Sequence, residues 1–171
     1  MIENFDVAMQ NVFKSEGGYA NDPRDPGGET NLGVTKASWA EYLNRSVGAG
    51  EMAALTKQMV IPFYKKTFWD ACKCDLLPTG VDYALFDASV NMGCSRAIKL
   101  LQEAIGATAD GVIGPKTLAL IEETNPIEML DKFSEAKNNF YRSLPTFATF
   151  GKGWLVRVAS VQTLSENMIH A

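Results

Sequence analysis

The sequence is poor in the residues that many hydrolases and metal sites require. It has one histidine, His170, and three cysteines, Cys72, Cys74 and Cys94, among its 171 residues. A Ser-His-Asp or Cys-His hydrolase needs an ordered histidine, and residues beside a chain end usually fray. With three thiols at least one stays unpaired, so no disulfide framework is indicated. The Cys72-x-Cys74 spacing is tighter than zinc ligands usually have, and we expect no metal and no other cofactor.

Long apolar stretches are also absent. No window of about 18 apolar residues occurs, which predicts that the chain has no membrane span. The opening residues, MIENFD, contain no basic region followed by an apolar one, so no secretory signal is predicted. We therefore expect the protein to remain in the cytoplasm in which it is made until a separate factor releases it.

The composition is that of an ordinary globular protein. Hydrophobic residues make up 46% of the chain and charged residues 21%, and the length favours one domain spanning 1–171, which we expect to be a monomer. The net charge of -4 argues against a nucleic-acid partner. No acidic residue lies between Ala136 and Ser165, where four cations are interleaved with aromatic residues: Lys137, Arg142, Lys152 and Arg157. This basic stretch suits an anionic envelope surface, although an ordinary solvated helix face has the same pattern.

Helical periodicity runs through most of the chain. Phe5, Met9 and Val12 recur at helical spacing, and the helix they predict must end at Gly17-Gly18. Residues 19–35, YANDPRDPGGETNLGVT, are rich in proline, glycine and short polar residues, and predict an irregular polar loop or a short hairpin. Further helices are predicted after Thr35, after Thr56 with a kink at Pro62, after Thr79, over 97–105, from Gly114-Pro115, from Asn125-Pro126 to about Ser143, and from Trp154 to Ile169. The predicted fold class is therefore mainly α, a helical bundle with one irregular loop.

Glu16 stands at the junction of the first predicted helix and the polar loop. The negative end of the helix dipole and the apolar face that precedes it both favour a neutral carboxylic acid. The glycines that follow leave room for a bulky ligand. A carboxyl group that keeps its proton near neutral pH is what glycosidic bond cleavage requires of its general acid.

The loop supplies candidates for the second group that a glycosidase needs, which holds a water molecule or stabilises positive charge on the sugar. Three carboxylates, Asp22, Asp25 and Glu29, lie close together in sequence, with Thr30 and Asn31 beside them. Turn formation explains acidic loop residues equally well, because Asp and Asn cap turns for local reasons. The residues alone leave the choice of partner carboxylate open.

The segment SEGGYANDPRDPGGETNLGVT, residues 15–35, resembles the signature of glycoside hydrolase family 108. That family includes phage endolysins that act as N-acetylmuramidases, and the resemblance implies a lysozyme-like fold with Glu16 as the catalytic acid. The segment is also similar, more loosely, to the phage T4-type lysozyme pattern of glutamate, aspartate and threonine, which implies catalytic roles for Asp25 and Thr30. The gap between Asp25 and Thr30 is one residue shorter than in that pattern, so Glu29 could replace either residue.

A second region, FDASVNMGCSRAIKLLQEAIG at 86–106 followed by DGVIGPKT at 110–117, resembles the peptidoglycan-binding half of the same family. The resemblance implies a catalytic lobe over 1–90 and a peptidoglycan-binding lobe over 91–171. No linker rich in proline, glycine or serine separates the two halves, so we expect them to depend on each other.

Substrate contacts are expected from Tyr19, Glu29, Asn31 and Asn91. An aromatic ring suits the apolar face of a pyranose, and an amide both donates to and accepts from an N-acetyl group. Tyr19 would serve equally well as a packing residue that pins the loop, and Asn91 as a helix end. Three tryptophans at core-like positions, Trp39, Trp69 and Trp154, are expected to be buried.

The function expected from these features is that of an endolysin. It would hydrolyse the β-1,4 bond between N-acetylmuramic acid and N-acetylglucosamine in peptidoglycan, act on the wall in the periplasm after a holin-type permeabiliser releases it, and lyse the host cell. A lytic transglycosylase or a chitinase-like glycosidase would use a similar acid. A peptidoglycan-binding module without catalysis is the alternative from a different class.

Overall fold

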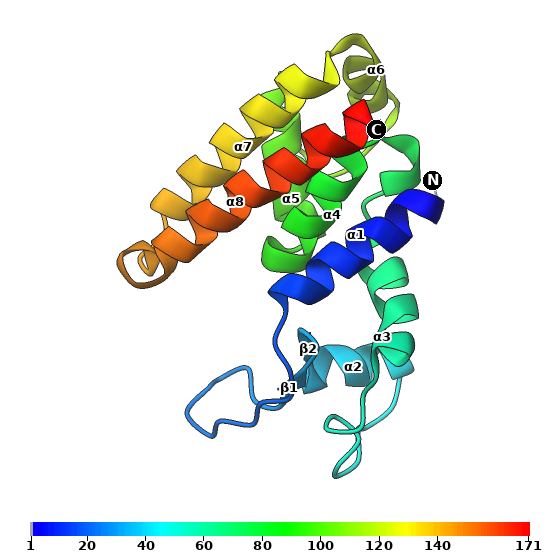
Figure 1. The fold of residues 1–171 in the computed structure, drawn as a ribbon, viewed down its shortest axis with the longest axis vertical. Coiled ribbons are helices and arrows are strands. Elements are labelled where there is room, and N and C mark those ends of the chain that lie inside the picture. The colour runs from blue at the N-terminus through cyan, green and yellow to red at the C-terminus, as the bar shows by residue number, and fades with distance from the viewer. Residues whose placement is uncertain (1) are drawn as a thin grey trace. The chain divides into compact units, whose positions relative to one another are not determined.

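In this computed structural model of the protein, the structure is described for residues 2–171, with side chains from Glu3 onward. Figure 1 shows a mainly helical chain, which confirms the predicted fold class. Its contacts divide it into two compact units, Phe5–Thr67 (the smaller unit) and Phe68–Ala171 with the first residues of the chain (the larger unit).

The smaller unit holds most of helix α1, a two-stranded hairpin and two short helices. The elements are α1 (Ile2–Ser15), β1 (Thr30–Asn31), β2 (Val34–Thr35), α2 (Lys36–Leu43) and α3 (Lys57–Tyr64). Helix α1 ends at Ser15, with one residue between it and Gly17-Gly18, as predicted. The rings of Trp39 and Phe63 pack edge to face with centroids 5.9 Å apart, and Tyr42 contacts both of them. These aromatic contacts join α2 to α3.

The predicted polar loop contains both irregular turns and a hairpin. Strands β1 and β2 are antiparallel, with Thr30 opposite Thr35 and Asn31 opposite Val34. The two residues between the strands, Leu32 and Gly33, have φ angles of 52° and 77°. Positive φ at both central positions is typical of the tight turns that match the twist of a hairpin. The turns over 21–29 extend away from this hairpin (Figure 1).

Several helix starts follow the predicted capping residues. The side chains of Thr35, Thr56 and Asn125 accept backbone N–H bonds at the starts of α2, α3 and α7. Thr79 does not cap α4, because Gly80 directly precedes that helix and the Thr79 hydroxyl accepts a hydrogen bond from Asn4 at 3.1 Å. After α3, which contains Pro62, the chain continues as a π-helical turn over Lys65–Asp70 that the periodicity did not predict.

The larger unit is a helical bundle built around one buried helix. Its elements are a 3₁₀ turn (Cys74–Leu76), α4 (Val81–Met92), α5 (Cys94–Ala104), α6 (Pro115–Glu123), α7 (Pro126–Arg142) and α8 (Phe147–His170). Helices α5, α7 and α8 all contact α4, and every residue from Val81 to Ser89 is buried. The prediction that the last helix starts at Trp154 is wrong, because α8 begins at Phe147 and runs through Gly151, which packs closely against the Phe147 ring.

The basic C-terminal stretch is not a uniform surface patch. Lys137 is only 3% exposed, and Arg157 pairs with the buried Asp87 at 2.8 Å. The expectation that four cations face an anionic surface is therefore wrong for these two, because both point into the bundle. Arg142 and Lys152 are exposed.

Over residues 2–171 no helix combines the length and apolarity needed to cross a bilayer. The three cysteines are free thiols. Within the same residues no group of three or more His, Cys, Asp or Glu side chains is arranged to hold a metal ion.

Candidate active site

Glu16 lies in the smaller unit, one residue beyond α1. Its backbone N–H still donates to the Val12 carbonyl at 3.0 Å, which continues the last helical turn, and its side chain is half-buried. The carboxyl group packs over the hairpin turn at Gly33. A Cβ atom added to Gly33 would lie 2.7 Å from Glu16 Oε2 and 2.5 Å from the Tyr64 hydroxyl oxygen. The turn can therefore approach the carboxyl group this closely only with glycine at position 33.

Tyr64 forms the other side of this contact, and the sequence did not single it out. The ring is 1% exposed, and its hydroxyl donates to the Leu32 carbonyl at 2.7 Å. Phe13 meets the ring edge on, with centroids 6.2 Å apart, and Phe63 does so at 5.5 Å. Tyr64 thus holds the hairpin turn in place next to Glu16. The aromatic spacing in α3 was the available signal, but it reads equally well as core packing.

Two of the three loop carboxylates are engaged by neighbouring side chains. Asp22 forms an ion pair with Arg24 at 2.9 Å, and the hydrogen bonds from Arg24 lower the pKa of Asp22. Glu29 accepts a hydrogen bond from the Tyr19 hydroxyl at 2.8 Å and pairs with Lys36 at 3.2 Å. The Tyr19 bond, followed by Lys36, lowers the pKa of Glu29. Both carboxylates are therefore held ionised while they stabilise the loop.

Asp25 differs from its two neighbours. Its Oδ1 accepts a bond from the Gly27 N–H at 2.8 Å, which is the local turn contact that aspartate commonly makes. The residue is exposed, and no ion pair to it occurs among the described side chains. Asp25 is thus the loop carboxylate that remains available to a ligand.

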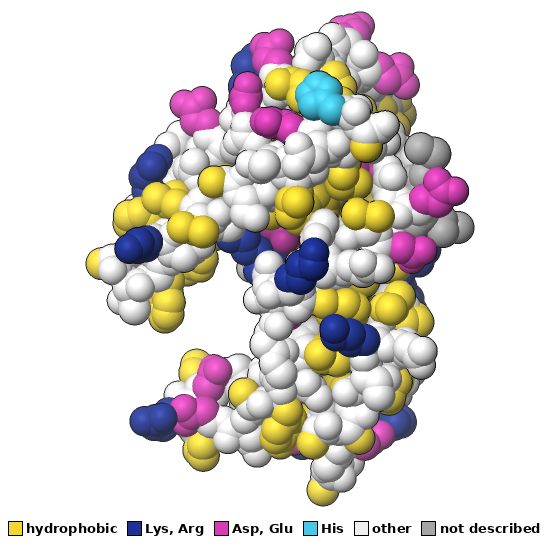
Figure 2. Space-filling view, in the orientation of Figure 1, with side chains coloured by type: hydrophobic (Ala, Val, Ile, Leu, Met, Phe, Trp, Pro, Cys, Tyr) yellow, Lys and Arg dark blue, Asp and Glu magenta, His cyan; other side chains and the backbone are white. Residues whose placement is uncertain are grey.

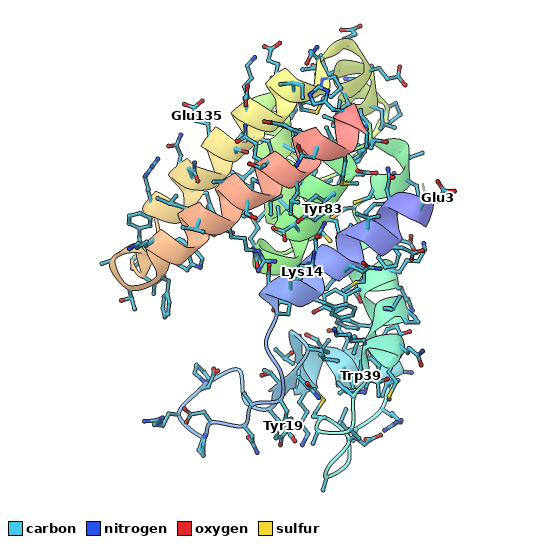
Figure 3. All side chains as sticks on the ribbon, in the orientation of Figure 1. Glu3, Lys14, Tyr19, Trp39, Tyr83 and Glu135 are labelled. Carbon is cyan, nitrogen blue, oxygen red and sulfur yellow. The ribbon has the colours of Figure 1, made fainter. Side chains whose placement is uncertain are left out.

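Thr30 and Asn31 form strand β1. The backbone of Thr30 exchanges two hydrogen bonds with Ala20, at 2.9 and 2.8 Å, and so closes the base of the loop. Asn31 is 6% exposed, and its Nδ2 donates to the Met52 carbonyl at 2.8 Å. The Asn31 amide therefore ties the segment before α3 to the hairpin. Tyr19 lies at the base of the same loop (Figure 3), with 46% of its surface exposed.

Asn91 belongs to the larger unit, near the end of α4. It is exposed and lines a pocket of about 240 Å³ together with five other residues: Met92, Phe140, Tyr141, Leu144 and Trp154. The rings of Tyr141 and Trp154 are stacked, with centroids 5.0 Å apart and planes inclined by 26°. We name this the aromatic pocket.

Two of the three tryptophans that were predicted to be buried are buried, and the third lines this pocket. Trp39 and Trp69 are buried, as predicted. The prediction that Trp154 belongs to the core is wrong, because the residue is half-buried and its ring lines the aromatic pocket. An aromatic stack beside an amide has the chemistry that suits an N-acetylated sugar.

Comparisons with known proteins identify the family of the chain. The family model described as "Glycosyl hydrolase 108" matches residues 9–93, and the one described as "Predicted Peptidoglycan domain" matches residues 96–159. The solved structure of Brucella abortus SagA is 38% identical to the chain, covers 100% of it and 98% of its own length, and superposes with a TM-score of 0.92. No curated protein matched. The chain is a glycoside hydrolase that acts on peptidoglycan, and it belongs to glycosyl hydrolase family 108.

Proposed function

We propose that the protein hydrolyses the β-1,4 bond between N-acetylmuramic acid and N-acetylglucosamine, with Glu16 as the general acid. The observation that carries this proposal is the close packing of the Glu16 carboxyl group over Gly33, beside the Tyr64 hydroxyl. A general acid must be held at a fixed position relative to the glycosidic oxygen. The hairpin turn and the Tyr64 ring supply that fixation.

Asp25 is the proposed partner carboxylate. The oxocarbenium-like transition state needs a negative charge or a water-activating base close to the sugar. Asp22 and Glu29 already neutralise Arg24 and Lys36, whereas Asp25 makes only a turn hydrogen bond. Thr30, which the T4-type resemblance assigns to the same chemistry, belongs to the hairpin whose turn contacts Glu16.

Sugar binding is assigned to aromatic faces in both units. The Tyr19 hydroxyl is bonded to Glu29, so the exposed ring of Tyr19 is held in one orientation and offers a face to a pyranose. In the larger unit, Asn91 with the Tyr141–Trp154 stack would hold an N-acetyl sugar. Glu29 and Asn31 would then act on the substrate through the loop and hairpin that they fix.

The proposed biological role is that of an endolysin. A glycosidase of peptidoglycan destroys the layer that resists turgor, so access to the wall suffices for host lysis. A holin-type permeabiliser would provide that access. Expression of the enzyme alone should leave cells intact, and expression together with a pore-forming partner should lyse them within minutes. Rapid lysis by the enzyme alone would contradict the need for a permeabiliser.

The chemistry is tested by digesting purified peptidoglycan and measuring the masses of the products. Hydrolysis at the proposed bond yields reducing N-acetylmuramic acid ends, a lytic transglycosylase yields 1,6-anhydro ends, and a binding module yields no product. Turnover of chitin oligomers would identify a chitinase-like enzyme. Glu16→Gln should abolish product formation without changing the melting temperature, because an amide cannot donate the proton as an acid does. Near wild-type turnover in this variant would show that Glu16 is not the general acid.

A further inference from the structure

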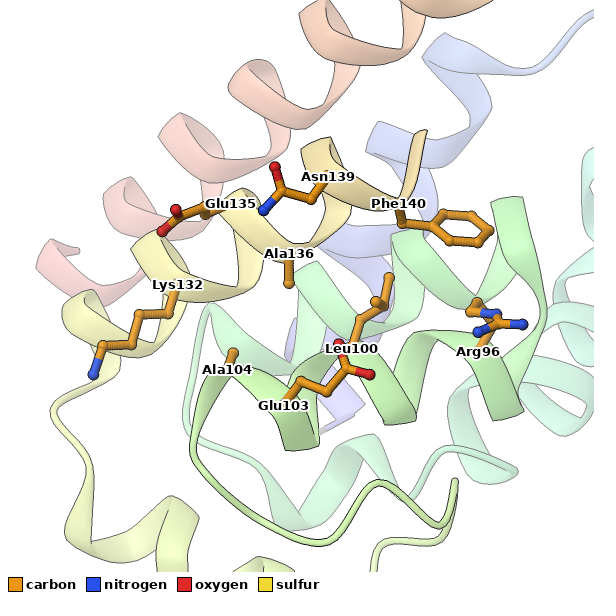
Figure 4. Close-up of a pocket in the computed structure, with 9 residues that line it drawn as sticks. All are labelled: Arg96, Leu100, Glu103, Ala104, Lys132, Glu135, Ala136, Asn139 and Phe140. Atoms are coloured by element: carbon orange, nitrogen blue, oxygen red, sulfur yellow. The ribbon is translucent and has the colours of Figure 1, made fainter. Parts of the chain in front are cut away.

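A second pocket lies in the larger unit, between α5 and α7 (Figure 4). It has a volume of about 480 Å³, and all of its lining residues fall within the region matched by the peptidoglycan domain. The residues that matter here are three from α5 and three from α7: Arg96, Glu103, Ala104, Glu135, Ala136 and Phe140. We name this the groove. None of the catalytic roles proposed above uses it.

The sequence explains why the two helices leave a hollow here. Each helix presents a single face, because lining residues recur at spacings of three, four and seven along α5 and α7. Ala104 and Ala136 supply only methyl groups to these faces, while larger side chains stand around them (Figure 4). A small floor with a polar rim gives space for a ligand that carries polar groups.

The charges on the rim have both signs and are not neutralised within the described chain. The Arg96 guanidinium lies over the Phe140 ring, 5.2 Å from its centroid, and takes part in no ion pair there. Glu103 and Glu135 likewise have no ion-pair partner among the described residues. Lys132, in contrast, is already bound to Glu128 at 2.6 Å. The free charges are thus one guanidinium and two carboxylates.

The spacing of these charges determines how long a ligand must be to form ion pairs at both ends of the groove. Arg96 and Glu103 are seven residues apart in α5, which corresponds to about 10 Å along the helix axis. Figure 4 shows Arg96 and Phe140 at one end of the groove and Glu135 toward the other. A ligand with a carboxylate at one end and an ammonium group several bonds away would pair with both ends. A short zwitterionic peptide has this form.

Phe140 connects the groove with the aromatic pocket, because it lines both. A ligand that filled the two sites together would be a sugar with a charged peptide branch. Peptidoglycan has this connectivity, since its glycan strand carries short peptides with free carboxylates and a free amine. Both sites thus correspond to one branched substrate.

We propose that the groove between α5 and α7 binds the peptide stem of peptidoglycan, with Arg96 holding a stem carboxylate and Glu103 with Glu135 holding a stem amine. This inference rests on the proposed function, because it takes peptidoglycan as the substrate. Recognition of the stem would direct the enzyme to glycan that carries peptides.

Binding of the free stem peptide, without sugar, tests the proposal independently of hydrolysis. Titration of the full-length protein by NMR should shift the signals of α5 and α7. Arg96→Gln should weaken binding at least about tenfold, as expected for the loss of a charge-assisted bond of about 1.4 kcal/mol or more. The double variant Glu103→Gln/Glu135→Gln should weaken it similarly. Arg142→Gln and Glu123→Gln, which remove exposed charges outside the groove, are matched controls and should bind as the wild type does.

Stem peptides with one kind of charged group chemically blocked test the two ends of the groove separately. Acetylating the stem amine should make the glutamate variants indistinguishable from the wild type while Arg96→Gln still weakens binding, and amidating the carboxylates should do the reverse. Ala136→Leu, which fills the floor, should exclude the peptide without unfolding the protein, as a melting curve would verify. Wild-type affinity in Arg96→Gln, or signal shifts confined to other helices, would overturn the proposal. Failure to hydrolyse peptidoglycan would instead contradict the proposed function. The peptide-binding measurements would still decide whether the groove binds the stem.

Discussion

At the scale of single residues, substitutions in the polar loop are expected to differ in their effect on turnover. Asp25→Asn should reduce turnover of peptidoglycan by orders of magnitude, because it removes the one loop carboxylate that has no cation partner among the described residues. Thr30→Ala should reduce turnover less. Glu29→Gln should mainly loosen the loop, since it weakens the contacts to Tyr19 and Lys36. The measurement is initial rate on purified peptidoglycan, with melting temperature as the check on folding. A much larger loss of rate in Glu29→Gln than in Asp25→Asn would reassign the partner carboxylate.

A buried lysine gives a prediction about stability. Burial lowers the pKa of Lys137 from its ordinary 10.5 to about 8, partly offset by Asp87. The unfolded chain keeps the Lys137 proton up to about pH 10.5, so between pH 8 and 10.5 unfolding takes up a proton, and this lysine makes the protein more stable as the pH rises. Below pH 8 the cost of burying the charge is present in full.

The variant Lys137→Met should remove that cost. We expect a higher free energy of unfolding at pH 7, by up to about 3 kcal/mol, and an advantage over the wild type that shrinks as the pH is raised toward 10. Denaturant titrations of both proteins at pH 7, 8 and 9 measure it, and Arg142→Met serves as the exposed control. A stability difference that does not change with pH would mean that Lys137 is not buried as a charged group.

At the scale of the elements, the hairpin turn can be tested with a matched pair of glycines. Gly33 and Gly28 both have positive φ, 77° and 67°, but a Cβ at Gly28 would meet nothing within 4 Å. Alanine should therefore cost about 1 kcal/mol of backbone strain at either position. Only Gly33→Ala should also displace Glu16 and Tyr64, and lower the rate of hydrolysis by at least about tenfold. Equal rates in the two variants would show that the contact at Gly33 does not position the acid.

Local signals predicted the helix boundaries well where a side chain makes the cap. Thr35, Thr56 and Asn125 each satisfy backbone N–H groups of their own helix, so the information lies within a few residues. The start of α8 was missed because glycines usually end helices, whereas here Gly151 lies inside α8, where the Phe147 ring leaves no space for a Cβ atom. The π-helical turn after α3 was missed because its spacing has no distinct sequence pattern.

At the scale of the whole molecule, the position of the catalytic candidate was predictable and its surroundings were not. Glu16 stands out by its place between a helix and two glycines. Gly33, which lies against that carboxyl group, and Tyr64, whose hydroxyl lies against the same glycine, come 17 and 48 residues later, and such contacts leave no local pattern. The same reason applies to the burial of Lys137 and to the ion pair of Arg157 with Asp87, because both depend on packing between distant helices.

The two exposed cations of the basic stretch are expected to help the enzyme approach an anionic surface. Arg142 and Lys152 flank the connection from α7 to α8, and Phe150 beside it is 55% exposed. Figure 2 shows hydrophobic and basic side chains together at this end of the two helices. Arg142→Gln/Lys152→Gln should lower activity on permeabilised cells severalfold and flatten its salt dependence, because added salt screens surface charge. Activity on a small soluble muropeptide should be unchanged, and an equal loss on both substrates would exclude a role in approach.

The ion pair between the buried Asp87 and Arg157 also constrains the order in which the chain can fold as it is synthesised. Asp87 is 4% exposed in α4, and its cation comes from α8, 70 residues later. A carboxylate buried without its partner costs several kcal/mol. Until the ribosome has released α8, the burial of Asp87 lacks this ion pair, and the final packing of α4 is disfavoured. Nascent chains stalled before Arg157 should be cut by protease within α4, and chains stalled after a linker that lets α8 emerge should be protected there.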